Sequence, residues 1–263
     1  MKRKISFTFI LLTLIMSFAF LVADDTVPNE DQDEGRKVLF QEDFSENELD
    51  MSRWKLTKDG DFSQVAVDVQ RVEREGQDDH RLRLMANTLK TSDPIKYFGV
   101  RSVEKMDLSQ LREVSFDLDW NAQRNGCYLA AALYICPVES ENPRNEKEWV
   151  KFEWTGVPPG KNIRTNVWAK VNSVRKQLYT DWGPRDENGR PQGRPVGPGD
   201  HRIKLLFDDK GIRVSADAKQ VCYAEHSLSF AAGYLYLQMS SGTNYPSREV
   251  YFDNITVTSA ETQ

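Results

Sequence analysis

Several features that mark common enzyme and metal chemistries are absent from this sequence. It has three cysteines in 263 residues and no C-x-x-C spacing, which argues against a zinc cluster or a disulfide framework. Cys127 and Cys136 lie in one apolar run and would point to opposite faces of a strand, so a disulfide would have to include Cys222. Buried free thiols are the simpler expectation. G-x-S-x-G and phosphate-binding glycine loops are also missing, which removes the usual signs of a serine nucleophile or a phosphate site.

An excess of positive charge is absent as well. The chain carries 35 Lys and Arg against 40 Asp and Glu, a formal net charge of −5. Binding of nucleic acid requires a basic face that displaces counterions, so we expect no nucleic-acid partner. Beyond the first 23 residues, no apolar run reaches the ~18 residues needed to span a bilayer.

The N-terminus has the pattern of a secretory signal peptide. Lys2-Arg3-Lys4 precedes an apolar run over residues 5–22, and Ala23 stands before an acidic stretch. We predict a signal peptide at 1–23 and a secreted, periplasmic or cell-envelope location without membrane insertion after cleavage. An uncleaved anchor is the alternative, because the run is close to the spanning length. Residues 24–37 are acidic and poor in apolar residues, and are predicted to form a disordered linker.

Residues 38–260 are predicted to form one all-β domain. Short runs with alternating apolar residues, such as 112–122 and 250–257, are separated by turn residues, which is typical of an antiparallel sandwich or barrel. Residues 126–137 are apolar at almost every position. We interpret them as a central strand covered on both faces, with a helix as the competing interpretation.

Three segments carry a resemblance to a known family. They are F-x-E-D-F at 40–44 followed by Trp54, G-Y-L-Y-L-Q at 233–238, and Y-F-D-N-I-T-V at 251–257. Together they resemble the concanavalin A-like lectin/glucanase superfamily. The resemblance implies a two-sheet antiparallel jelly-roll sandwich in which the first and last strands are neighbours. It also implies an association with carbohydrate, since that superfamily contains lectins, glycan-binding modules, glycoside hydrolases and polysaccharide lyases, so the fold does not settle the function.

Catalytic residues are harder to find. The E-x-D-x-x-E strand motif of the best-known hydrolases of this superfamily is not present. Asp117 and Asp119 are two residues apart on one predicted strand face, about 6.6–6.8 Å between Cα atoms. A retaining glycosidase needs two carboxylates about 5–5.5 Å apart, so this pair and Glu153 are the catalytic candidates. An ordinary solvated strand face is the alternative explanation. A lyase would need a Tyr or His base, and no histidine has a recognisable partner in the sequence.

A non-catalytic binding site has better support. Four of the six tryptophans lie within 149–182, among polar residues, and sugar rings stack on indole planes. The predicted strand around Val167 places Trp168 between Asn166 and Lys170 on its polar face. We therefore expect an exported, monomeric protein that binds a polysaccharide or glycan. An unorthodox glycoside hydrolase or lyase and an envelope-associated structural or adhesion domain are the alternatives. The candidate ligand-binding residues are Trp154, Arg164, Asn166, Trp168, Tyr179, Asp181 and Trp182.

No cofactor is required by this interpretation, but the resemblance implies a structural calcium. In that superfamily a cation often ties the first strand to the last, and the matching positions here are Glu42, Asp43 and Asp253. Their oxygen ligands suit calcium. The alternative is that Asp253 and Asn254 make only local hydrogen bonds at a strand.

Overall fold

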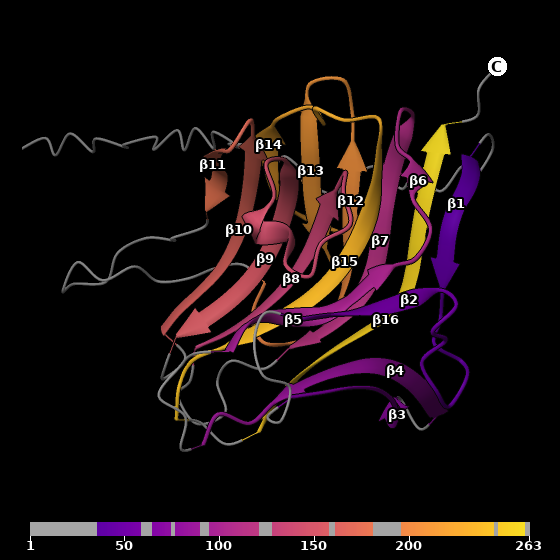
Figure 1. The fold of residues 1–263 in the computed structure, drawn as a ribbon, viewed down its shortest axis with the longest axis vertical. Coiled ribbons are helices and arrows are strands. Elements are labelled where there is room, and N and C mark those ends of the chain that lie inside the picture. Colours follow the sequence, from indigo (N-terminus) through magenta and orange to yellow (C-terminus); the bar gives the residue numbers. More distant parts are fainter. Residues whose placement is uncertain are drawn as a thin grey trace, which may run out of the picture.

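The computed structural model describes residues 36–58, 65–74, 77–89, 95–120, 128–157, 161–180, 196–244 and 247–260. These residues form two antiparallel sheets of eight strands each, which Figure 1 shows as two layers of curved strands. The sequence-based prediction of an all-β, two-sheet antiparallel sandwich is confirmed. A single turn of 3-10 helix, Pro143–Asn145, is the one helical element among the described residues.

The first sheet, called sheet A, has β16 near its centre. Its order is β14-β13-β12-β7-β16-β4-β3, and β1 also pairs with β16. The predicted neighbourhood of the first and last strands is therefore correct. The strands of sheet A are β1 (Arg36–Glu42), β3 (Val65–Arg74), β4 (Gln77–Ala86), β7 (Leu111–Trp120), β12 (Gly199–Phe207), β13 (Gly211–Ala216), β14 (Lys219–Glu225) and β16 (Arg248–Ala260).

The second sheet, called sheet B, has the order β11-β10-β9-β8-β15-β5-β2, and the short β6 pairs with β15. All eight residues of β8 are buried, as predicted for a central strand in this region. The strands of sheet B are β2 (Trp54–Lys58), β5 (Ile95–Ser102), β6 (Met106–Asp107), β8 (Leu129–Cys136), β9 (Trp149–Val157), β10 (Lys161–Val171), β11 (Val174–Thr180) and β15 (Ala232–Ser241).

The main core lies between the two sheets and is rich in aromatic rings. Phe116 of β7 contacts Trp154 of β9 across the sandwich, edge to face, with ring centroids 5.6 Å apart. On its other side Phe116 lies 6.1 Å from Phe252 of β16. Rings of this size remove a large apolar area from water, so these contacts hold the sheets face to face.

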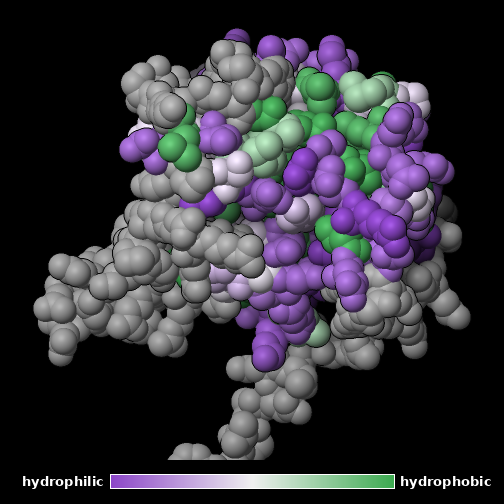
Figure 2. Space-filling model, turned by 90° about the horizontal axis from the view of Figure 1, so that it is seen from below, coloured by the Kyte–Doolittle hydropathy of each residue, from purple (hydrophilic) through white to green (hydrophobic). Residues whose placement is uncertain are grey.

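The remaining features of the fold concern the surface, the cysteines and the N-terminal residues. Figure 2 shows one face of the molecule, on which hydrophilic residues cover most of the coloured surface and apolar residues gather in one part. Cys136 and Cys222 are both buried, and Cys127 lies outside the described residues. The predicted signal peptide and residues 24–35 also lie outside them, while β1 begins at Arg36, inside the predicted linker. The described part of the chain contains no helix long and apolar enough to cross a membrane.

Gly99 in β5 provides a test of the sheet B packing. Its φ is +155°, and an added Cβ would lie 2.0 Å from the carbonyl oxygen of Leu237 in β15. We expect Gly99→Ala to lower the free energy of unfolding by ~2 kcal/mol or more, because backbone must move to relieve the clash. Urea denaturation measures this. The control is Gly197→Ala, where no atom lies within 4 Å of the added Cβ. Equal stability of the two variants would contradict the packing described.

Candidate functional site

The candidate site lies on the outer face of sheet B, the face that points away from the main core. Strand β9 turns Phe152 and Trp154 into the core, and alternation then directs Trp149, Lys151 and Glu153 to the outer face. The strand register places Lys151 between Tyr134 of β8 and Trp168 of β10. Residues from three neighbouring strands therefore meet around one lysine and one glutamate.

A buried hydrogen-bonded cluster joins Lys151 and Glu153 to Tyr97 of β5 and Asn166 of β10. Lys151 Nζ donates to Glu153 Oε1 at 2.6 Å and to the Tyr97 hydroxyl oxygen at 3.3 Å. The Tyr97 hydroxyl donates to Glu153 Oε1, and Asn166 Nδ2 donates to Glu153 Oε2 at 3.2 Å. Each of the four residues is less than a tenth exposed. We call this group the Lys151–Glu153 cluster.

Charge and burial decide the protonation of this cluster. Burial alone would raise the pKa of Glu153, but the positive charge of Lys151 and the donated hydrogen bonds outweigh it and hold that pKa below its usual value. Burial lowers the pKa of Lys151 and raises the pKa of Tyr97 well above its usual value. Glu153 is thus an ion-paired carboxylate at neutral pH and is poorly suited to be a general acid. Tyr97 stays protonated and is poorly suited to be a base.

Aromatic rings surround the lysine. Lys151 Nζ lies 5.2 Å from the ring centroid of Tyr97, 5.6 Å from that of Tyr134 and 5.9 Å from that of Trp168. On the edge strand β11, Arg175 Cζ lies 4.4 Å from the Trp168 centroid. These are cation–π distances, so the rings stabilise positive charge on this face.

The predicted ligand-binding residues separate into three groups. Arg164, Asn166 and Trp168 lie on the outer face of β10, and Arg164 and Trp168 are partly exposed. Trp154 has no exposed surface and lies in the core, and Tyr179 packs against the same core. These two placements correct the expectation that both contact a ligand, because their rings face the other sheet. Asp181 and Trp182 lie outside the described residues.

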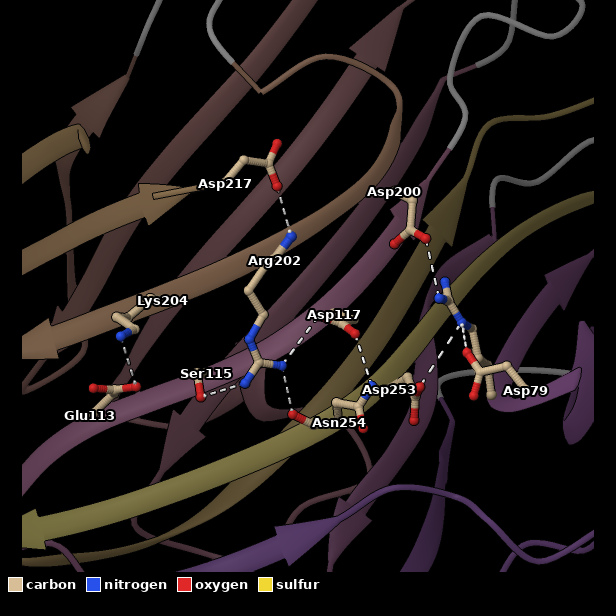
Figure 3. Close-up of polar contacts among 11 residues, drawn as sticks. Asp79, Glu113, Ser115, Asp117, Asp200, Arg202, Lys204, Asp217, Asp253 and Asn254 are labelled. Carbon is tan, nitrogen blue, oxygen red and sulfur yellow. Dashed lines mark hydrogen bonds and ion pairs between the residues drawn. The ribbon is translucent and has the colours of Figure 1, made fainter. Parts of the chain in front are cut away.

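The catalytic candidates do not come together. Asp117 and Asp119 are on β7 in sheet A, whereas Glu153 is on the outer face of the opposite sheet. Asp117 is engaged in a different network, which Figure 3 shows. It accepts from Arg202 Nη1 at 3.2 Å and from Asn254 Nδ2 at 2.9 Å. A site that combines all three carboxylates is therefore excluded by their positions.

The predicted calcium ligands do not form a coordination shell. Glu42 accepts from the Phe44 amide and from Trp54 Nε1 and pairs with Arg53, while the Asp43 carboxylate accepts from the Ser45 amide. A pocket of about 390 Å³ is lined by Glu42 and Asp43 together with Arg202, a cation.

Asp253, the third predicted ligand, faces a cation as well. It accepts from Asn254 Nδ2 at 2.9 Å, and its carboxylate lies 4.0 Å from Arg81 Nε. Burial raises the pKa of Asp253 to about 7. No group of three or more His, Cys, Asp or Glu among the described residues is placed to hold a metal. Guanidinium groups supply the positive charge here, and the residues do not fit a calcium ion.

Tyr97, Lys151 and Arg175 belong to the site but are missing from the residues predicted for it. Lys151 could have been found, because E-W-V-K-F-E-W at 148–154 places it two residues before Glu153 on the same strand face. Tyr97 comes from a strand more than fifty residues away, and only the sheet order brings it to Glu153.

Comparison with solved structures identifies the fold class. A glycoside hydrolase family 16 endo-glucanase from Bacteroides ovatus aligns with a TM-score of 0.54 and 12% identity over 84% of this chain and 100% of its own. LamAcat from Zobellia galactanivorans aligns with a TM-score of 0.56 and 11% identity over 84% and 97%. The β-glucanase from Bacillus licheniformis gives 0.52 and 12% over 88% and 100%.

These likenesses establish the fold. The chain has the concanavalin A-like jelly-roll sandwich fold, as the sequence resemblance indicated. Two of these three structures are described as glucanases, but at such low identity the likeness extends to the fold alone. No protein-family model and no curated protein sequence matches the chain.

The Lys151–Glu153 pair can be tested by stability. Lys151→Met leaves a buried carboxylate without its counter-charge, so we expect the free energy of unfolding to fall by ~3–5 kcal/mol at pH 7. The double variant Lys151→Met/Glu153→Gln removes both charges and should recover most of that loss. Urea denaturation of the two variants and the wild type gives the comparison. A single variant as stable as the wild type would show that the pair is not buried as described.

Metal dependence is tested by thermal unfolding. A ligand that binds only the folded state raises the unfolding midpoint. Because Arg53 and Arg81 already face the carboxylates of Glu42 and Asp253, we expect the same midpoint in millimolar calcium and in a chelator. A clear rise in calcium that Asp253→Asn abolishes would contradict this expectation.

Proposed function

We propose that the protein binds a polysaccharide or another glycan across the outer face of sheet B and does not cleave it. The observation that carries this proposal is the state of Glu153. It is the only carboxylate in strands β2, β5, β8, β9, β10, β11 and β15, and it is held in an ion pair with Lys151 beside Trp168.

The absence of a second carboxylate in these strands argues against hydrolysis. Both retaining and inverting glycosidases use a pair of carboxyl groups, one of which must donate a proton. In strand β9 the position two residues before Glu153 holds an ammonium group instead. The charged, fully hydrogen-bonded Glu153 also has no proton to donate near neutral pH.

Three further features support a glycan ligand. The solved structures with this fold that the chain resembles include glucanases. The outer face combines aromatic rings with amide, hydroxyl and charged groups, the mixture that recognises sugar rings and their substituents. Export by the predicted signal peptide would bring this face into contact with extracellular polysaccharide.

A panel of soluble and insoluble polysaccharides, scored for both binding and product release, tests the proposal. We expect binding of at least one polysaccharide with no new reducing ends. Trp168→Ala should weaken binding by roughly tenfold, since an indole at the centre of a contact contributes about 1–2 kcal/mol.

The matched control is Tyr223→Ala, which removes an exposed ring from β14 on sheet A and should leave binding unchanged. Release of oligosaccharides would replace the binding proposal with an enzyme. Binding to no polysaccharide would reject both.

A further inference from the structure

The positive charge on the outer face of sheet B indicates which class of glycan binds there. This inference rests on the proposed function. We propose that the ligand is an acidic polysaccharide, whose carboxylate or sulfate groups are bound by Arg144, Lys170 and Arg175 beside Trp168. The charge of sheet B, the contacts that place these three residues near one another and the stacking of Arg175 each support it.

The two sheets differ sharply in charge. The strands of sheet A hold twelve Lys and Arg and twelve Asp and Glu. In sheet B, the seven strands that pair in sequence from β11 to β2 hold one carboxylate, Glu153. Their lysines and arginines are Lys55, Lys58, Lys96, Arg101, Lys151, Lys161, Arg164, Lys170, Arg175 and Lys176. A chain with a net charge of −5 therefore has one strongly cationic sheet.

Three cations gather at one place on this sheet. Lys170 Nζ and Trp149 Nε1 both donate to the carbonyl oxygen of Arg144, at 3.3 Å each, which fixes the short 3-10 helix against β9 and β10. Arg175 is opposite Lys170 in the β10–β11 ladder. Arg175 and Lys151 both lie at the Trp168 ring, and the charges of Arg144 and Arg175 lower the pKa of Lys151.

These three cations have no carboxylate partner within the part of the chain that the structure describes. The described acidic residues near the 3-10 helix make other contacts. Glu139 pairs with Arg101, and Glu146 ends the 3-10 helix and raises the pKa of Cys136. Like charges held together repel, and an anionic ligand would remove that repulsion.

The ring of Trp168 indicates why an acidic sugar fits better than a neutral one. Arg175 lies over the ring at 4.4 Å, so a sugar that stacked on that side would have to displace the guanidinium. An anionic group can instead bind the exposed Arg175 with the stack intact. A planar guanidinium held in this way matches the two oxygens of a carboxylate or sulfate.

The carboxylate nearest to these cations does not oppose an anionic ligand. Lys151, Tyr97 and Asn166 already occupy the oxygens of Glu153, and Lys151 neutralises its charge. The charged groups left for a ligand at this place are the donors Arg144, Lys170 and Arg175.

The experiment measures affinity of the full chain for four soluble probes. Polygalacturonate supplies carboxylates, carrageenan supplies sulfates, dextran is neutral, and duplex DNA is an unrelated polyanion. We expect binding to one or both acidic polysaccharides, a loss of affinity with rising salt, and weaker binding to dextran and DNA. The preferred acidic probe distinguishes carboxylate from sulfate recognition.

The decisive variants are neighbours on one strand. Arg175→Gln should weaken binding of the acidic probe by about tenfold or more, because a charge-assisted hydrogen bond is lost. Lys176→Gln removes the same charge from the adjacent position, which is opposite the core residue Ala169 and faces the other side of the sheet. It should change affinity by less than about twofold. Unfolding midpoints check that both variants are folded.

Each other result counts against the inference. Equal losses in the two variants would indicate unspecific attraction between charges. Comparable binding of DNA with the same dependence on Arg175 would assign the face to polyanions in general. Stronger binding of dextran that depends on Trp168 would overturn the acidic ligand and leave the proposed function standing. Binding to no polysaccharide at all would remove both.

Discussion

The buried ion pair of Lys151 and Glu153 is the interaction on which the outer face of sheet B depends. Burying two charges costs several kcal/mol unless each is fully hydrogen-bonded, and here Tyr97 and Asn166 complete the pair. Asn166 in turn accepts from Gln177 of β11 at 3.3 Å. Hydrogen bonds thus run from β5 to the edge strand through one carboxylate. They fix the side chains among which Trp168 and Arg175 lie, and so the geometry of the proposed binding face.

The two sheets differ in how the charges of their side chains are compensated. Sheet A balances its charges within itself, as in the contacts of Arg202 with Asp117 and of Arg81 with Asp200, and β16 ties it to the first strand. The strands of sheet B carry more positive than negative charge, and aromatic rings lie beside Lys151 and Arg175. Both sheets share one core, so the order of sheet A stabilises the face of sheet B. A stable sandwich can accept local repulsion on one face, because burial of the core outweighs it.

The sequence was sufficient to predict the fold because strand alternation and turn residues are local. It also placed Asn166 and Trp168 correctly, since both lie on one strand with an apolar opposite face. Trp154 directly follows Glu153 on the same strand. Because successive side chains point to opposite faces, Glu153 lies on the outer face and Trp154 points to the core. Tyr179 could not be placed by counting, because the β10–β11 register shifts between Val167 and Trp168. Contacts across strands, such as that of Tyr97 with Glu153, depend on sheet order and have no local signal.

The lysine at position 151 connects the two proposals, binding without cleavage and an acidic ligand. Two carboxylates on this strand would provide an acid and a nucleophile, but their charges would repel an acidic polysaccharide. Lys151 neutralises the charge of Glu153 within the sheet. The positive electrostatic potential of this face then comes from Arg144, Lys170 and Arg175. One substitution of charge at one strand position therefore accounts for both proposals. In both proposals the same feature is decisive, a lysine where a second carboxylate would otherwise lie beside Glu153.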